Sequence, residues 1–353
     1  MVGGLKLGKL QGGKLSVMAS ILSKRRVQTG IRPFDPYRDL EAVAELIGIA
    51  FGDNLDPAGR AALAEMRRAA RFGVVFGWLY QTGWSVEDSP PGFVWIERGR
   101  VVGNVSLRRT PARGGFLVGN VAVHPDWQGR GIAGALMEAA LDEIASLGGQ
   151  WVGLEVEADN QVARRLYERL QFAEVSRILH LLRPAGSSWN GEIPRCPSLR
   201  RGRHGDSEAL IDLVRAVIPE YQRPLLELRL VDYRLSWERA LDHFLEGRRE
   251  VWWVIEEKGA VCAAVRVLRE RRGRPDRLEF LVSPEYGGRF EDVLVWRAIS
   301  SLRGAPKKMI EVLLPNPDDS LVEALKIAGF RKLRVLIQMR RDLAALTHQV
   351  YLA

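Results

Sequence analysis

Two glycines lie between an apolar strand pattern and the start of a helix pattern, as glycines do in phosphate-binding loops. The stretch reads VAVHPDWQGRGIA, from Val121 to Ala133, and has glycine at 129 and 131. A helix N-terminus presents free backbone N–H groups and the positive end of the helix dipole, and missing Cβ atoms let oxygen atoms approach. The stretch therefore predicts an anion site suited to a phosphate or pyrophosphate, although a plain glycine turn would leave the same pattern.

Other phosphate and metal chemistries fit the chain less well. The stretch lacks the Lys-Ser/Thr pair of a P-loop and differs from the Gly-x-Gly-x-x-Gly pattern of dinucleotide folds. The two cysteines, Cys196 and Cys262, are far apart and have neither zinc-site spacing nor a disulfide framework. We therefore expect no metal, and a reducing cytoplasm is the simplest location.

A second group of candidates lies in the helix pattern DNQVARRLYERLQF, residues 159–172. Asn160 stands where the helix begins, so its side chain is either a helix cap or a hydrogen-bonding group for a ligand. Tyr167 shares a helix face with Ala163 and other apolar residues, which is typical of a core tyrosine. Its hydroxyl would still need a partner, and a departing thiolate could supply one.

A carboxylate stands out in the strand pattern WVGLEVE, residues 151–157. The apolar residues alternate and face one way, which places Glu155 on the other face of the strand. If this strand lies beside residues 121–123, Glu155 points toward the reacting groups and can accept a proton. The alternative is a solvent-facing strand residue. His124, directly before a proline, is expected to be a strand-end residue rather than a base.

Together these motifs resemble the acyl-CoA signatures of GNAT-type N-acetyltransferases. The first signature, Gln/Arg-x-x-Gly-x-Gly/Ala, matches from Gln128 to Ala133, and alanine at the last position is a common variant in that family. The second matches at Asn160, Ala163, Tyr167 and Phe172. The resemblance covers roughly residues 30–183.

The resemblance implies acetyl-CoA as the cosubstrate and a role for each matching residue. The strand at 121–123 would bond the pantetheine arm through its backbone, the loop at 128–134 would hold the pyrophosphate, and Asn160 would bond the pantetheine or acetyl end. The implied cofactor-binding residues are Val121, Ala122, Val123, Gln128, Gly129, Arg130, Gly131, Ile132, Ala133, Gly134, Asn160 and Ala163.

The implied reaction is direct attack of a primary amine on the thioester in a ternary complex. Glu155 would take the proton of the amine, as a glutamate in this place does in some protein N-terminal acetyltransferases of the family, and Tyr167 would protonate the leaving thiolate. The alternative is a non-catalytic acyl-CoA-binding or regulatory protein. The acceptor, a small molecule or a peptide, stays open, and four aromatic residues fall where this family shapes acceptor pockets: Trp78, Tyr80, Trp84 and Trp95.

The elements that must position these residues occur twice along the chain. DSEALIDLVRAV at 206–217 repeats the helix pattern that starts at Asp39, and the strand patterns at 251–270 repeat those at 92–109. Val123 and Val282 are 159 residues apart, and a stretch rich in proline, glycine and serine lies between the two series. The repeated order predicts two copies of one domain.

We therefore expect an α/β (α+β) fold of two tandem GNAT-like domains, each a mixed, mostly antiparallel central sheet flanked by helices. The expected boundaries are a flexible basic extension at 1–27, the acetyltransferase domain at 28–184, a linker at 185–198, a second domain at 199–343 and a tail at 344–353.

The second copy keeps the apolar pattern but not the polar motifs. By the repeat, Phe290 falls at the position of a loop glycine, and Glu291 and Asp292 open the following helix. Asp318 and Leu325 stand in place of the asparagine and the tyrosine. We therefore expect that this copy has lost coenzyme binding and serves as a scaffold or as a wall of the acceptor site.

Composition sets the remaining limits. The 353 residues carry a net charge of +9, and residues 1–30 hold six basic side chains and no acid. This concentration is typical of a solvated basic tail, so nucleic acid is not an expected partner. No apolar run approaches the roughly 20 residues that span a bilayer, so no membrane is expected either.

Overall fold

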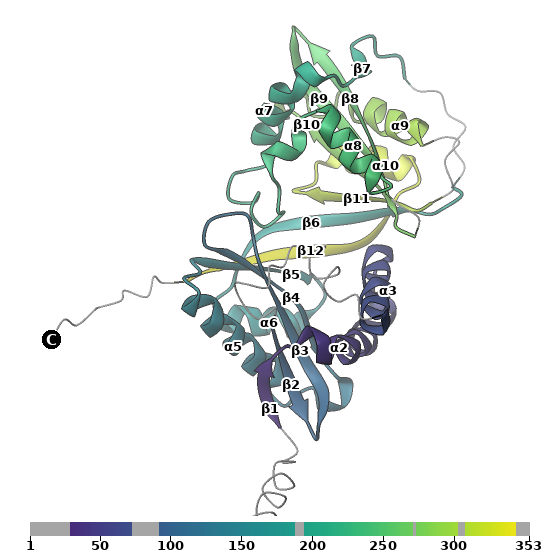
Figure 1. The fold of residues 1–353 in the computed structure, drawn as a ribbon. Coiled ribbons are helices and arrows are strands. Elements are labelled where there is room, and N and C mark those ends of the chain that lie inside the picture. The colour runs from purple at the N-terminus through teal and green to yellow at the C-terminus, as the bar shows by residue number, and fades with distance from the viewer. Residues whose placement is uncertain (1–28, 73–91, 188–193, 271–272, 303–307, 344–353) are drawn as a thin grey trace, which may run out of the picture.

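The computed structural model describes residues 29–72, 92–187, 194–270, 273–302 and 308–343. Its strands form one twelve-stranded sheet in the order β1-β2-β3-β4-β5-β12-β6-β11-β10-β9-β8-β7, with helices on both faces (Figure 1). We refer to residues 29–187 as the N-terminal half and to residues 194–343 as the C-terminal half. The expected fold class, a mixed and mostly antiparallel sheet flanked by helices, is confirmed.

The described elements of the N-terminal half are β1 (Gly30–Pro33), α2 (Pro36–Phe51), η1 (Gly52–Asn54), α3 (Pro57–Phe72), β2 (Gly92–Glu97), β3 (Arg100–Arg109), β4 (Gly115–Val123), η2 (Pro125–Trp127), α5 (Ile132–Ser146), β5 (Trp151–Glu157), α6 (Gln161–Arg169) and β6 (Ala173–Arg183). Those of the C-terminal half are β7 (Leu199–Arg201), η3 (His204–Asp206), α7 (Ser207–Val217), η4 (Leu230–Tyr233), α8 (Trp237–Leu245), β8 (Arg249–Glu257), β9 (Ala260–Arg269), β10 (Asp276–Val282), η5 (Pro284–Tyr286), α9 (Glu291–Ser301), β11 (Ile310–Pro315), α10 (Asp319–Ile327) and β12 (Arg331–Asp342). None of these described helices has the length and apolar character of a membrane span.

The last strand of each half lies in the other half of the sheet. β12, from the end of the C-terminal half, pairs with β5, and β6 pairs with β11, both antiparallel. β6 and β12 also pair with each other and cross the middle of the molecule (Figure 1). The two halves therefore share one sheet through exchanged strands, which the sequence pattern did not predict.

The sheet contains two short parallel pairs, one in each half. β4 pairs with β5 at Gly115–Val118 and Trp151–Leu154, and β10 pairs with β11 at Asp276–Leu278 and Ile310–Val312. Beyond these residues neither pair continues. Each half thus has a gap where two parallel strands separate, at the end where both strands run into loops and helices. We refer to each of these gaps as a slot.

Apolar side chains anchor helices on both faces of the N-terminal half. Ile132 and Leu136 of α5 and Tyr167 of α6 join Val152 and Leu154 of β5 in one core cluster. On the other face, α2 and α3 pack on β2 through a second cluster that contains Leu40, Val43, Leu63, Met66, Val94 and Ile96. The slot between β4 and β5 therefore lies between two helical layers.

A repeated ion pair fixes the first helix of each half. Arg32 donates two hydrogen bonds to Asp39 at 2.5 and 2.6 Å, and Arg200 donates two to Asp206, both at 2.8 Å. Each carboxylate also accepts a backbone N–H at the start of its helix. This shared geometry supports the repeat seen in the sequence.

Candidate functional site

The glycines before α5 have the backbone conformation that their residue type suggests. Gly129 and Gly131 have φ angles of 75° and 78°, in the left-handed region that favours glycine. A Cβ at either position would meet no protein atom within 4 Å. The loop therefore has open space above its backbone.

Local contacts hold this loop in shape. The Gln128 amide donates to the carbonyl of Val123 at 3.1 Å, and the Arg130 guanidinium donates to the carbonyl of Asp126 at 3.1 Å and lies 4.4 Å from the ring centre of Trp127. The N–H groups of the first turn of α5, which begins at Ile132, have no acceptor within the helix. A fixed row of donors at a helix N-terminus can bind an anion such as a pyrophosphate.

The loop leads into the slot between β4 and β5. Ala122 and Val123 of β4 pair with β3, but the β4–β5 ladder ends at Val118 and Leu154. The edge of β4 that faces β5 is therefore not used in this ladder beyond Val118. An extended ligand with amide groups can bond to such an edge.

α6 carries three of the predicted residues along this slot. Asn160 caps the helix, because its Oδ1 accepts from the N–H of Ala163 at 3.0 Å, and its amide nitrogen can still donate. Tyr167 is 6% exposed and its ring lies 6.0 Å from that of Phe172. Burial raises the pKa of Tyr167 to about 12, so the hydroxyl keeps its proton near neutral pH.

Glu155 lies on the opposite face of β5 from Tyr167. The Gln338 Nε2 atom donates to the Glu155 carboxylate at 2.9 Å, and the Ser176 hydroxyl donates to Gln338 Oε1 at 2.6 Å. Burial by the surrounding protein raises the pKa of the Glu155 carboxyl, and the hydrogen bond from Gln338 opposes that rise. The side chain still reaches solvent through a cavity that it lines.

The structure thus brings the predicted residues to one place, around the slot. Residues 121–123 form one edge and residues 128–134 the end, while Asn160, Ala163 and Tyr167 approach from α6. An acid and a base on opposite faces of the sheet can act on the two sides of a thioester held between them.

Gln338 and Ser176 are functional candidates that sequence reasoning missed. Gln338 is fully buried and Ser176 nearly so, and Gln338 stands between two apolar residues, Ile337 and Met339. A buried polar residue in a strand is the signal that was available. Pairing it with Glu155 requires the strand exchange.

Of the four aromatic residues expected near the acceptor, the structure describes Trp95. Trp78, Tyr80 and Trp84 lie outside the described residues. Trp95 of β2 packs against the core beneath α5. His124 accepts the N–H of Asp126 at 3.3 Å and begins η2, as a strand-end residue would.

The equivalent loop of the C-terminal half holds a carboxylate of its own. Glu291 is 4% exposed and accepts the N–H groups of Gly288 at 2.8 Å and Phe290 at 2.9 Å. Asp318 caps α10, and Leu325 is fully buried. The loop amides that are open in the N-terminal half are therefore bonded within the protein here. In the part of the chain that the structure describes, no group of His, Cys, Asp and Glu side chains could hold a metal ion.

Sequence comparisons identify a family and relatives of the chain. The model of the acetyltransferase (GNAT) family matches residues 61–172. N-alpha-acetyltransferase 30 of Schizosaccharomyces pombe is 36% identical over 89 residues, which are 24% of this chain and 59% of that protein. The [ribosomal protein bS18]-alanine N-acetyltransferase of Salmonella typhimurium is 31% identical over 109 residues, which are 26% of this chain and 74% of that protein. The chain thus spans less than two thirds of the yeast relative.

Solved structures share the fold across both halves. A GCN5-related N-acetyltransferase from Sphaerobacter thermophilus has a TM-score of 0.62 and 16% identity, over 88% of this chain and 95% of that one. A tandem GNAT protein from the clavulanic acid biosynthesis pathway has a TM-score of 0.55 and 14% identity, over 89% and 98%. At these identities the likeness concerns the fold. Taken with the sequence relatives, the chain belongs to the acetyltransferase (GNAT) family.

Proposed function

We propose that the chain transfers an acetyl group from acetyl-CoA to a primary amine by direct attack in a ternary complex. The observation that carries this proposal is the open glycine loop at Gly129 and Gly131, which leads into the slot between β4 and β5. The yeast and Salmonella relatives are both N-acetyltransferases by name, which supports the same reaction class.

In this proposal, the N-terminal half supplies the hydrogen-bond donors for acetyl-CoA. The backbone of residues 128–134 would hold the pyrophosphate, the free edge of residues 121–123 would bond the pantetheine amides, and the Asn160 amide would donate to the same arm. Ala163 has a small side chain that leaves room beside them. When bound, acetyl-CoA supplies the activated acetyl group as a thioester.

Glu155 is proposed as the general base. An amine attacks only when it is neutral, and a carboxylate within reach can accept its proton directly or through water. The surrounding protein raises the pKa of Glu155, which makes it a better base than a glutamate with an ordinary pKa. The N–H of Val123 would polarise the acetyl carbonyl.

Tyr167 is proposed as the general acid. Its raised pKa keeps the proton on the hydroxyl until a leaving thiolate requires it. The reaction needs no covalent intermediate on the protein. The free thiols of Cys196 and Cys262 agree with a reducing cytoplasm as the site of the reaction.

We propose further that coenzyme binds only in the N-terminal half. In the C-terminal half, Glu291 already bonds the loop amides, and its charge would repel a pyrophosphate. Residues 199–343 would then act as scaffold and as part of the acceptor site.

The test is release of free thiol from acetyl-CoA across a panel of primary amines. We expect turnover with at least one amine and none with the Gly131→Glu variant, whose side chain would occupy the anion site. Tight binding of acetyl-CoA without turnover on any amine would instead favour a non-catalytic acyl-CoA-binding protein.

A further inference from the structure

A cavity of about 750 Å³ extends from Glu155 into the C-terminal half. Its floor is the sheet from β5 through β12, β6, β11 and β10 to β9, and residues between Val217 and Tyr233 form the opposite wall. Five inter-strand spacings separate β5 from β9, so the cavity is about 24 Å long. It thus reaches well beyond the reacting groups of the N-terminal half.

Strand register places the polar groups of the floor on one face of the sheet. Glu155 is opposite Gln338 on β12, and Glu279 of β10 is opposite Arg266 of β9. Paired positions in a sheet project to the same side. Glu155 and Glu279 therefore line one face of the sheet, separated by four strand spacings, or about 19 Å, across the strands and by a further offset along them.

The part of the floor between these two carboxylates is apolar. Ile178 is opposite Leu336, and Leu313 of β11 lies on the same face. Leu313 is 42% exposed, an unusual fraction for a leucine in the middle of a sheet. The surface therefore runs from a carboxylate, across hydrocarbon, to a second carboxylate.

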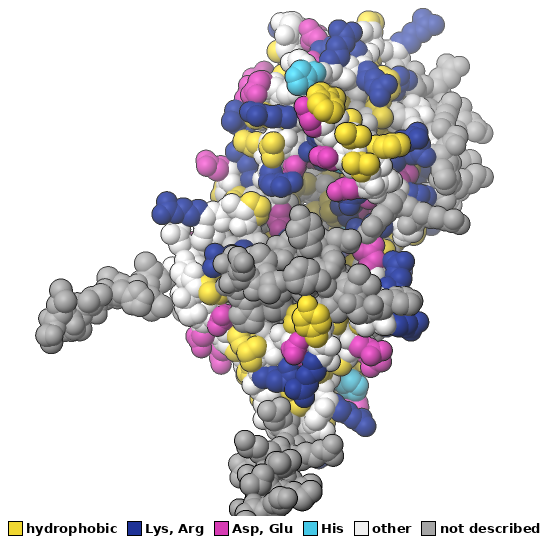
Figure 2. Space-filling view, viewed as in Figure 1, with side chains coloured by type: hydrophobic (Ala, Val, Ile, Leu, Met, Phe, Trp, Pro, Cys, Tyr) yellow, Lys and Arg dark blue, Asp and Glu magenta, His cyan; other side chains and the backbone are white. Residues whose placement is uncertain are grey.

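The lining is acidic although the chain is basic. Among the described residues, seven carboxylates and three guanidinium groups line the cavity, whereas the whole chain has a net charge of +9. The face in Figure 2 shows basic and acidic side chains interspersed. The lining carboxylates are Glu155, Glu227, Asp232, Glu279, Glu291, Glu311 and Asp318. Arg108 and Arg239 pair with Glu227 and Asp232 from outside the lining, and the smaller acidic excess that remains attracts cations.

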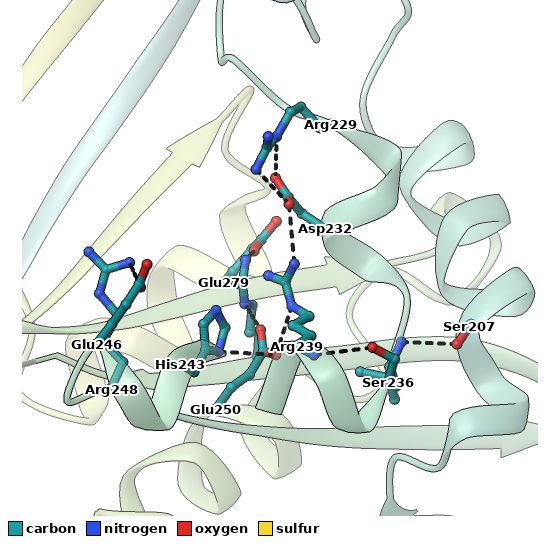
Figure 3. A network of polar contacts seen from close by, with 12 residues as sticks. Ser207, Arg229, Asp232, Ser236, Arg239, His243, Glu246, Arg248, Glu250 and Glu279 are labelled. Carbon is teal, nitrogen blue, oxygen red and sulfur yellow. Dashed lines mark hydrogen bonds and ion pairs between the residues drawn. The ribbon is translucent and has the colours of Figure 1, made fainter. Parts of the chain in front are cut away.

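Ion pairs hold the acidic groups of the distal end in place. Arg239 donates to Asp232 at 3.1 Å and to Glu250 at 3.1 Å, and Figure 3 shows Asp232 between Arg229 and Arg239. Glu279 accepts from the Tyr233 hydroxyl and from Arg266, yet its side chain is 31% exposed. A carboxylate has about four acceptor positions, so Glu279 can still bind a cation.

We propose that this cavity binds the acceptor, a linear primary amine with a second cationic group, whose reacting amine lies at Glu155 and whose second cation lies at Glu279. This assignment rests on the proposed acetyl transfer. An extended peptide fits less well, because its backbone amides would lie against Ile178, Leu313 and Leu336 without hydrogen-bond partners. An anionic acceptor would meet the excess of carboxylates.

The test is calorimetric binding of 1,12-diaminododecane and of dodecylamine to the full chain without acetyl-CoA. The two probes share a hydrocarbon chain and differ in the second charge. We expect the diamine to bind roughly tenfold more tightly, and Glu279→Gln to remove that preference, since a hydrogen-bonded charge pair contributes on this scale. Glu285→Gln, an exposed residue outside the lining, is the matched control and should keep the preference.

A second variant protects the test against misfolding. Leu313→Lys changes an exposed side chain and places a cation in the apolar middle, so it should weaken diamine binding at least tenfold. Equal affinities for the two probes, a preference unchanged in Glu279→Gln, or diamine binding unchanged in Leu313→Lys would overturn the assignment.

Binding and turnover separate the two proposals. A diamine preference that depends on Glu279, without thiol release on any amine, would support the cavity and contradict acetyl transfer. Acetylation of simple amines with no diamine preference would support acetyl transfer and contradict the assignment of the cavity.

Discussion

Tyr167 combines deep burial with a position beside the slot where a thiolate would leave. Replacing it with phenylalanine keeps the packing on Phe172 but removes the only proton that the side chain can give. We expect Tyr167→Phe to lower kcat roughly 100-fold, with the affinity for acetyl-CoA nearly unchanged. Steady-state kinetics and calorimetry check this. A kcat near that of the original chain would remove the role of acid from Tyr167.

Gln338 tunes Glu155 from another strand. Burial raises the pKa of Glu155, and the donated hydrogen bond favours the charged form and so limits that rise. Gln338→Met removes the donor, so the pKa should rise further and the acidic limb of kcat/KM should move to higher pH. At pH values above the acidic limbs of both proteins, the rate of the variant should return to that of the original chain. A merely structural defect would lower the rate at every pH.

The pH profile of the Ser176→Ala variant is the control for this prediction. Ser176 orients the Gln338 amide but does not touch Glu155. The acidic limb of kcat/KM should therefore shift less in Ser176→Ala than in Gln338→Met. Limbs at the same pH in all three proteins would contradict the coupling.

For single residues, the sequence predicted the geometry correctly where the contacts are with nearby positions in the chain. Gly129, Gly131 and Asn160 each act on the backbone within a few positions, so the pattern sufficed to predict their geometry. Gln338 is 183 positions from Glu155, and only the exchanged strand brings them together.

At the element scale, the two Arg–Asp pairs tie strands β1 and β7 to the helices that follow. Hydrogen bonds from Arg200 hold the pKa of Asp206 below its ordinary value. For Asp39, burial alone would raise the pKa, but the hydrogen bonds that the carboxylate accepts from Arg32 outweigh the effect of burial and lower the pKa. A lowered pKa stabilises the fold above the unfolded-state pKa, near 4, and that contribution is lost as the pH falls through the folded-state value.

Asp206→Asn should therefore reduce the free energy of unfolding at pH 7 by about 2–3 kcal/mol. The difference from the original chain should shrink as the pH falls below about 4, because the Asp206 carboxyl is protonated first in the unfolded chain. Urea unfolding at pH 7 and pH 3 measures it. Asp212→Asn, at a largely exposed ion pair with Arg215, should change stability by less than about 0.5 kcal/mol. An equal loss at pH 3 and pH 7 would contradict the assignment.

At the scale of the whole molecule, the order of elements was predictable and the exchange of strands was not. The repeat offsets set which strands and helices correspond, and the fold class follows. β6 and β12 have similar apolar patterns, so either could complete either half, and the sequence does not distinguish these pairings. The exchange has a structural consequence, because it joins Glu155 to a cavity formed largely by the C-terminal half.

The two halves differ most at the loop before α5 and its counterpart before α9. One has open space above Gly131, and the other has Glu291 bonded to the amides of Gly288 and Phe290. We therefore propose that coenzyme binds at the first loop alone.

Calorimetric titration with acetyl-CoA tests this assignment most directly. We predict one acetyl-CoA per chain, and none for Gly131→Glu, because the new side chain adds bulk and negative charge where the pyrophosphate would lie. Circular dichroism of the variant shows that the fold is retained. Two equivalent sites per chain, or unchanged binding by folded Gly131→Glu, would contradict the central claim.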